Sequence, residues 1–189
     1  SIWENDQRDR QVHRVRWQTH SPRIRRDAIQ QVPTRVLGAR NLEDESVRHP
    51  GDCIVHFWIH HEETKDVFDW SGDRDLRTFI LLCAKHGLLV FLRLGPFCHG
   101  ECRNGGIPDW LWESRAKRTT DPAFLDRTRI LYREIAKQIE GLLFKAGGPV
   151  IMVQLENELC EGERGIPYMQ ALKRIAIEVG IDVPIYTAT

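Results

Sequence analysis

Between residues 53 and 186, short runs of strand-forming residues alternate with longer segments that have helical periodicity. The strand-like runs occupy residues 53–58, 88–92, 150–153 and 183–186. The three segments between them carry apolar residues three or four positions apart, and each opens on a helix-start signal, namely Asp73, Asp121 or Pro167. Alternation of this kind predicts parallel strands joined by right-handed crossovers, which is an α/β fold.

The first 52 residues follow this pattern poorly. A weak alternation of apolar residues predicts one short strand at 13–19. From 24 to 52, charged residues interrupt any apolar stripe, and prolines and glycines leave room for one short helix at most. This segment is either a divergent stretch or one read in a shifted frame, and resequencing the source DNA distinguishes the two.

The composition allows one ordinary domain and excludes several classes of partner. The chain has 189 residues, which is short for a complete eight-stranded α/β barrel of about 250 residues. Its 27 basic and 27 acidic residues cancel, so nothing predicts binding to nucleic acid or to an anionic membrane. No run approaches the roughly 18 apolar residues of a membrane span. The five scattered cysteines do not form a disulfide framework.

The predicted strand at 150–153 follows a Gly-Gly-Pro break and ends in a dense polar cluster. Two carboxylates and two amides, those of Gln154, Glu156, Asn157 and Glu158, occupy five positions. If the strand stays regular, Asn157 points to one side and the other three point to the opposite side. Two carboxylates that face one cavity repel, so one of them is expected to hold its proton near neutral pH, as a general acid must. These considerations do not choose between Glu156 and Glu158.

Polar and aromatic residues also follow the other predicted strands. Glu62 follows the strand at 53–58, and Arg93 and Glu101 follow the strand at 88–92. In an α/β barrel the carboxyl ends of the strands converge on one face, where active sites lie. Carboxylates, an amide and tryptophans suit neutral polyols such as sugars. The chain lacks a phosphate-binding glycine loop, a serine or cysteine nucleophile motif and a dinucleotide fingerprint.

Each of these features also has a plainer explanation. Glu156 and Glu158 can be solvated residues of an ordinary loop, because perturbed acids mark functional sites only as a tendency. His56 and His60 are spaced like a helical zinc pair, but they lie in a predicted strand and lack the HExxH order. We therefore expect no metal and no other cofactor.

Beyond residue 52, a series of short motifs occurs in a characteristic order. They are Phe57-Trp58, His61-Glu62, Phe68-Asp69-Trp70-Ser71-Gly72, Arg74-Asp75-Leu76, Arg93, Gly95-Pro96-Phe97, Glu101, residues 105–111 and residues 147–158. Together these motifs resemble glycoside hydrolase family 35, the β-galactosidases. The resemblance covers about residues 53–189, and the segment 147–158 is its strongest part.

The resemblance implies a role for four residues of this chain. Glu158 matches the family's general acid/base, and Asn157 matches the amide that binds the sugar near its 2-hydroxyl group. Glu101 matches the carboxylate that holds galactose hydroxyls, and the backbone of Gly100 lines the same pocket. The family's nucleophile is a glutamate on a later strand, so we assign no nucleophile within residues 1–189. The implied reaction is the removal of terminal β-galactose with retention of configuration.

The resemblance also implies a (β/α)8 TIM barrel, of which about the first five β/α units are present. On this interpretation, residues 1–189 form a single partial catalytic domain, in which 1–52 is divergent and 53–189 matches well. The expected partner is a small-molecule or oligosaccharide β-galactoside. Family resemblance favours a secreted or periplasmic location, and neither the cysteines nor the motifs indicate an oligomeric state.

Several departures from the family pattern support an alternative function. The family has a tyrosine where this chain has Val55, an asparagine at Ile59, a tyrosine at Phe97 and an aromatic residue at Cys102. With the nucleophile also absent, the alternative is a catalytically inactive fragment or a carbohydrate-binding pseudoenzyme. A related barrel glycosidase with another sugar preference is a third interpretation.

Overall fold

The structure is a computed structural model that describes residues 51–98, 101–114, 117–159 and 162–187. The strand predicted at 13–19 and the predicted substrate residue Gly100 lie outside the described residues. Among the described helices, none is both long enough and apolar enough to cross a bilayer.

Four parallel strands form one sheet in the order in which they occur along the chain. They are β1 (Gly51–Val55), β2 (Leu89–Gly95), β3 (Val150–Leu155) and β4 (Ile185–Tyr186). One register line runs across all four strands through Ile54, Leu92, Val153 and Ile185. Sequential parallel strands with intervening helices are the arrangement of a (β/α) barrel. The prediction that the chain forms part of such a barrel is confirmed.

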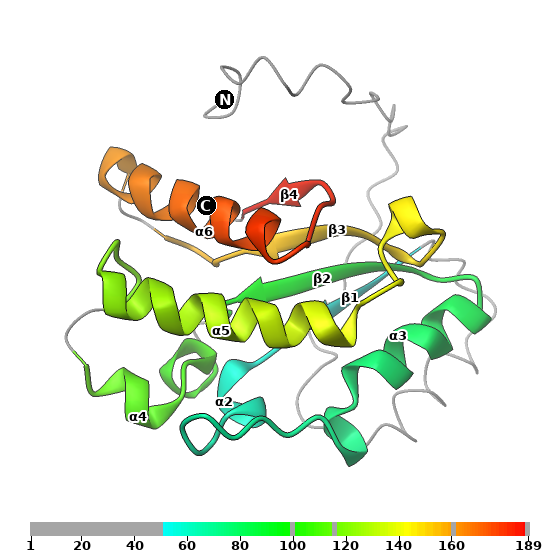
Figure 1. Cartoon of the computed structure of the whole chain (residues 1–189), viewed down its shortest axis with the longest axis horizontal. Helices are drawn as coiled ribbons and strands as arrows, with labels where there is room; N and C mark the ends of the chain where they lie inside the picture. The colour runs from blue at the N-terminus through cyan, green and yellow to red at the C-terminus, as the bar shows by residue number, and fades with distance from the viewer. Residues whose placement is uncertain (1–50, 99–100, 115–116, 160–161, 188–189) are drawn as a thin grey trace.

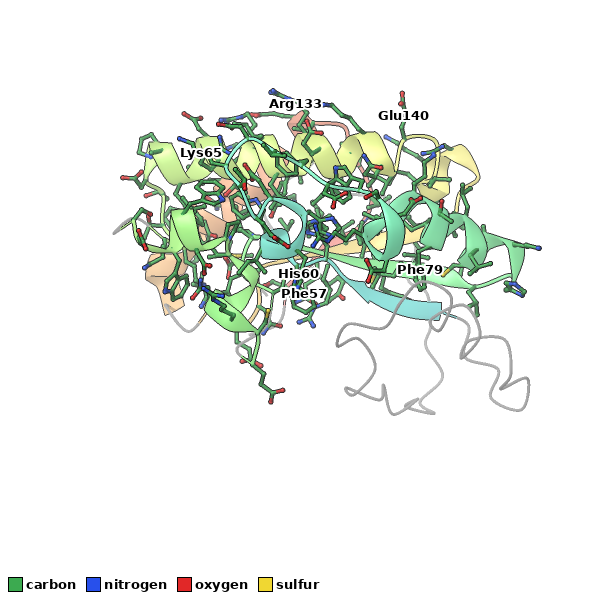
Figure 2. All side chains as sticks on the ribbon, turned by 90° about the horizontal axis from the view of Figure 1, so that it is seen from below. Phe57, His60, Lys65, Phe79, Arg133 and Glu140 are labelled. Atoms are coloured by element: carbon green, nitrogen blue, oxygen red, sulfur yellow. The ribbon has the colours of Figure 1, made fainter. Side chains whose placement is uncertain are left out.

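Three longer helices lie along one face of this sheet (Figure 1). They are α3 (Leu76–Lys85), α5 (Pro122–Gln138) and α6 (Ile166–Glu178). Helix α5 buries Phe124, Leu131 and Ile135 in the core, whereas Arg133 of this helix and Glu140 just after it are exposed and lie at the outer surface in Figure 2. One apolar stripe facing the sheet and charged residues facing solvent are what the helical periodicity predicts.

One of the two predicted aspartate helix caps is confirmed, and the other is wrong. The Asp121 carboxylate accepts hydrogen bonds from the backbone N–H groups of Ala123 and Phe124, as predicted for the start of α5. Asp73 does not cap α3. A 3-10 turn at Gly72–Arg74 comes first, and the Asp75 carboxylate caps α3 by accepting from the N–H of Thr78 at 2.8 Å.

The strand predicted at 53–58 is shorter than expected, because β1 ends at Val55 and a short helix, α2 (Trp58–His61), follows. The backbone N–H of Glu62 closes this helix on the carbonyl of Trp58 at 3.0 Å. The Trp58 side chain is fully buried, and its indole nitrogen donates to the Glu62 carboxylate at 2.6 Å. A run of apolar residues reads as strand or buried helix equally well, so this boundary depends on tertiary packing.

The Gly-Gly-Pro break before β3 has a steric cause. A Cβ atom on Gly148 would lie 2.1 Å from the Leu142 carbonyl oxygen. That oxygen accepts the hydrogen bond from the N–H of Val150 at 3.0 Å, which aligns the start of β3. Leu142 itself lies beyond the end of α5, although the periodicity places it on the helix. The turn between α5 and β3 therefore needs glycine at 148 because two backbone segments touch there.

Candidate active site

The backbone leaves the extended conformation at the end of β3. The strand ends at Leu155, and Glu156 and Glu158 then adopt φ angles of 57° and 51°. The expectation of regular alternation through Glu158 is therefore wrong. Left-handed backbone at two residues that are not glycine requires support from surrounding contacts. The turn separates the two carboxylates, since Glu156 is buried and Glu158 is exposed.

Glu156 is held in the interior by two donors. The Tyr168 hydroxyl donates to Oε1 at 2.6 Å, and the Arg118 guanidinium donates to Oε2 through Nε at 3.0 Å and contacts it through Nη2 at 2.8 Å. Burial raises the pKa of Glu156 above its usual value, while the Arg118 charge and the hydrogen bonds from Tyr168, Arg118 and the Asn157 N–H act in the opposite direction. With both oxygens engaged, Glu156 is a structural carboxylate.

Asn157, which is 4% exposed, has its amide oriented by two neighbours. Its Oδ1 accepts hydrogen bonds from the Arg93 guanidinium on β2 and from Gln154 Nε2, the latter at 3.2 Å. Gln154 Nε2 also donates to the Glu156 carbonyl at 2.7 Å. Because both contacts use the oxygen of the amide, the side chain of Asn157 is fixed next to the exposed Glu158.

The segments that carry Glu101 and Glu158 leave neighbouring strands at the same edge of the sheet. Gly95, at the end of β2, pairs with Leu155, at the end of β3, and its carbonyl accepts the N–H of Glu156 at 3.0 Å. Glu101 is exposed on the turn that follows β2. Asn157 and Glu158 directly follow the carboxyl end of β3, and Glu101 lies on the segment that follows the neighbouring strand β2, as expected for a site at the carboxyl ends of parallel strands.

The loop after β2 is tightly packed. The Cys98 thiol donates to the His56 carbonyl at 2.7 Å, and the Cys98 N–H donates to the Gly105 carbonyl at 2.7 Å. A Cβ atom on Gly105 would lie 1.9 Å from the ring of Phe97. Cys98 and Cys102 are free thiols, and burial raises the pKa of both. The hydrogen bonds of Cys98 hold the end of the segment after β2 against His56 and Gly105.

Glu62, which follows β1 and α2, is not one of the solvent-accessible residues at the carboxyl ends of the strands. Its side chain is fully buried and accepts hydrogen bonds from Trp58 Nε1, from the backbone N–H of Asp66 at 2.8 Å and from the Arg127 guanidinium. Arg127 lies on α5, so this buried ion pair ties the segment after α2 to the helix layer. The sequence alone placed Glu62 with the strand-end polar cluster, whereas the structure assigns it to the core.

His56 and His61 form a ring stack with Trp70. The centroids of His56 and His61 are 4.4 Å apart, and those of His61 and Trp70 are 4.3 Å apart. The ring of His60 lies edge-on to the ring of Phe57 instead, and the two residues are close together in Figure 2. Within the described residues, no group of three or more histidine, cysteine or acidic side chains is arranged to hold a metal ion. None of the three histidines lies in a strand, because His56 follows the end of β1 and His60 and His61 lie on α2.

This ring stack predicts a loss of stability in acid. Burial lowers the pKa of His61 from 6.5 to about 4, against the opposing effect of the Asp69 carbonyl, which its Nδ1 contacts at 3.1 Å. Burial also lowers the pKa of His56. Between the two pKa values of His61, the unfolded chain binds a proton that the folded chain does not. Lowering the pH from 7 to 4 should therefore reduce the free energy of unfolding, by up to about 3 kcal/mol through His61.

Urea denaturation at a series of pH values measures this effect. His61→Phe keeps an aromatic ring in the stack and should flatten the pH dependence between 7 and 4. His86→Gln, at an exposed position, is the matched control and should keep the wild-type slope. Parallel curves for the wild type and His61→Phe would show that the stack does not titrate in this range.

Sequence reasoning missed Arg118, Tyr168 and Arg127. Arg118 lies in a basic stretch that reads as a solvated loop, and Tyr168 reads as an ordinary core residue of a helix. Their partners are remote in sequence, since Glu156 is 38 positions from Arg118 and 12 from Tyr168. No local pattern indicates such pairs.

Comparison with solved structures supports the fold. The most similar include GH5_18 from Streptomyces cattleya in complex with GlcNAc, with a TM-score of 0.65 at 12% identity over 82% of this chain and 39% of that chain. The exo-β-1,4-mannosidase Op5Man5 from an Opitutaceae bacterium has a TM-score of 0.57 at 16% identity over 79% of this chain and 28% of that chain. At these identities the likeness establishes the shared barrel architecture.

Comparison of sequences identifies the family. This chain is 36% identical over 126 residues to human beta-galactosidase-1-like protein 2, covering 66% of this chain and 20% of that protein. It is 36% identical over 128 residues to the beta-galactosidase of Xanthomonas manihotis, covering 67% of this chain and 21% of that protein. The chain thus spans about a fifth of the length of these curated relatives. The model of glycosyl hydrolases family 35 matches residues 52–188, and the chain belongs to that family.

Proposed function

We propose that this chain supplies the acid/base half of the active site of a retaining β-galactosidase. The observation that carries the proposal is the contrast at the end of β3, where Glu156 is buried and paired while Glu158 is exposed beside the oriented amide of Asn157. An acid that protonates a glycosidic oxygen must reach the substrate. Of the two neighbouring carboxylates, Glu158 alone meets that condition.

In the proposed reaction, the Glu158 carboxyl protonates the departing glycosidic oxygen while a second carboxylate attacks the anomeric carbon. The resulting Glu158 carboxylate then removes a proton from the water that hydrolyses the glycosyl–enzyme intermediate. Retention requires carboxyls about 5–5.5 Å apart on opposite sides of the anomeric carbon. Glu156 is unsuited to be the nucleophile, because Arg118 and Tyr168 occupy its oxygens. We assign that role to a glutamate on a later strand of the barrel.

We also assign substrate contacts to residues that follow β2 and β3. We assign Asn157 to the sugar hydroxyl next to the anomeric carbon, and we assign Glu101 and the backbone of Gly100 to the more distant hydroxyls. A neutral glycoside matches a site whose donors and acceptors are amides and carboxylates. The reaction needs no cofactor, since proton transfer and nucleophilic attack are both carried out by carboxyl groups.

The test uses the longest version of the protein that can be expressed. It is mixed with 4-nitrophenyl β-galactoside, and the first product is followed by proton NMR. We expect β-galactose to form before mutarotation, with turnover of the matching β-glucoside and β-mannoside at least tenfold slower. Initial release of α-galactose would exclude the retaining mechanism, and preferential turnover of another glycoside would exclude galactose as the sugar.

Val55, at a position where the family has a tyrosine, favours a second candidate, which is carbohydrate binding without turnover. Isothermal calorimetry with galactose and lactose separates the two functions. Saturable heat from a protein that releases no nitrophenol would establish the binding function. Turnover excludes it.

A further inference from the structure

Three segments that are far apart in sequence meet at the side chain of Arg118. Arg118 lies between α4 (Asp109–Trp112) and α5, and its guanidinium contacts the Glu156 carboxylate. It also donates to the Asn157 carbonyl at 2.8 Å and lies 3.9 Å from the centre of the Phe97 ring. In Figure 1, the carboxyl ends of β2 and β3 and the first turns of α5 and α6 all lie at the left.

The chemistry of these contacts requires a guanidinium. Nε and Nη2 both reach Glu156 Oε2, while Nη2 also reaches the Asn157 carbonyl, so two donors of one planar group satisfy two acceptors. The face of the same plane lies over the ring of Phe97. A lysine ammonium is a point charge that cannot reproduce both the fork and the stacking. A buried carboxylate without this partner would be strongly unfavourable.

Two of the Arg118 contacts are made to the turn that carries the proposed acid, Glu158. The Asn157 carbonyl lies between the two left-handed residues Glu156 and Glu158, and left-handed backbone persists only where its surroundings hold it. Phe97 belongs to the loop that leads from β2 to Glu101. One side chain thus links the turn that bears Glu158 to the loop that bears Glu101.

Two tyrosines anchor the same region from the helix layer. Tyr168, on α6, donates to Glu156 at 2.6 Å, and Tyr132, on α5, donates to the Gly95 carbonyl at 2.7 Å. Both side chains are buried. The hydroxyl of Tyr168 therefore holds the residue that follows β3, and the hydroxyl of Tyr132 holds the end of β2. Arg118 touches residues from both of the segments that follow these strands.

We propose that Arg118 is a positioning residue, whose guanidinium sets the direction of Glu158 and its placement relative to Glu101 by holding Glu156, the Asn157 carbonyl and Phe97 together. The proposal rests on the proposed function for the role of Glu158. Arg118 acts through its neighbours, so its loss should reduce kcat more than it raises KM. A displacement of the acid by about 1 Å is enough for a loss of about 100-fold.

The kinetic test compares Arg118→Ala, Arg118→Lys and Tyr168→Phe in the longest expressed version. We expect kcat to fall about 10- to 100-fold for Arg118→Ala and Arg118→Lys, and less for Tyr168→Phe, which removes one of the donors to Glu156. Added guanidinium ion at millimolar concentration should restore part of the activity of Arg118→Ala. Arg103→Ala, which removes an exposed pair with Asp109, is the matched control and should show neither loss nor rescue.

The leaving group of the substrate separates positioning from general damage. The 2,4-dinitrophenolate of an activated galactoside departs without a proton, so Arg118→Ala should form the glycosyl–enzyme intermediate from this substrate nearly as fast as the wild type, while losing activity on lactose. Equal losses on both substrates, or kcat on lactose within about threefold of the wild type, would overturn the proposal.

Hydrogen exchange tests the link between the strand ends without relying on activity. In Arg118→Ala, the amides of Gly95, Phe97, Cys98 and residues 156–158 should exchange at least about tenfold faster, while those of α3 keep their wild-type rates. If the wild type hydrolyses no galactoside, the proposed function fails, and this measurement still decides whether Arg118 holds the two segments. Unchanged exchange rates in both segments would refute that role. If Arg118→Ala does not fold, the same measurement is made on Arg118→Lys.

Discussion

Replacing Glu158 by glutamine should lower kcat/KM on lactose by about 10²- to 10⁴-fold, which is the usual contribution of a general acid/base. Glutamine keeps the size and hydrogen-bonding capacity of the side chain but has no proton to give. Glu158 is exposed, so this change should leave the stability of the protein nearly unaltered. The loss should fall on the step in which the glycosidic oxygen departs.

Leaving-group dependence makes the Glu158 experiment specific. With a 2,4-dinitrophenyl galactoside, departure needs no acid, so Glu158→Gln should form the glycosyl–enzyme intermediate at nearly the wild-type rate. Glu113→Gln, another exposed glutamate, is the control and should behave as the wild type on both substrates. Full activity of Glu158→Gln on lactose would remove Glu158 from the mechanism.

The largest expected effect on stability comes from Glu62. Its fully buried carboxylate accepts from Trp58 Nε1, from the Asp66 N–H and from Arg127, whose side chain is itself 14% exposed. Glu62→Ala would leave Arg127 charged and without its buried partner, and would leave the Trp58 indole nitrogen without an acceptor. Breaking a buried ion pair from one side costs about 3–5 kcal/mol.

Urea denaturation of matched variants measures this cost. Arg127 also pairs with Asp66 at 2.6 Å, and that carboxylate is exposed, so Asp66→Asn, which keeps a residue suited to the left-handed backbone there, should leave the midpoint nearly unchanged. The double variant Glu62→Leu/Arg127→Leu should be more stable than Glu62→Ala alone, because no charge remains buried. Equal midpoints for Glu62→Ala and Asp66→Asn would show that solvent reaches the Glu62–Arg127 pair.

Predictions that depended on neighbouring residues were the most accurate. The cap at Asp121 and the alternation of strands and helices follow from local hydrogen bonding and periodicity. The cap assigned to Asp73 was wrong by two positions, because a 3-10 turn precedes the helix. The strand predicted through Trp58 was also too long, since a short apolar run has no periodicity that distinguishes strand from helix.

The polar cluster after β3 illustrates what the sequence indicates and what it leaves open. From the sequence alone, Glu156 and Glu158 follow the same strand two positions apart, and their local pattern gives them equal standing. In the folded chain, two left-handed residues break the alternation and separate the two carboxylates. The sequence by itself determined that carboxylates and amides gather at the carboxyl end of this strand.

Tertiary structure decided which carboxylate is buried. Arg118, from the segment before α5, and Tyr168, from α6, reach Glu156 across 38 and 12 positions of chain. A carboxylate enters the interior only where such donors compensate its lost hydration. That compensation arises from the packing of helices on the sheet, and it leaves Glu158 as the carboxylate that faces solvent.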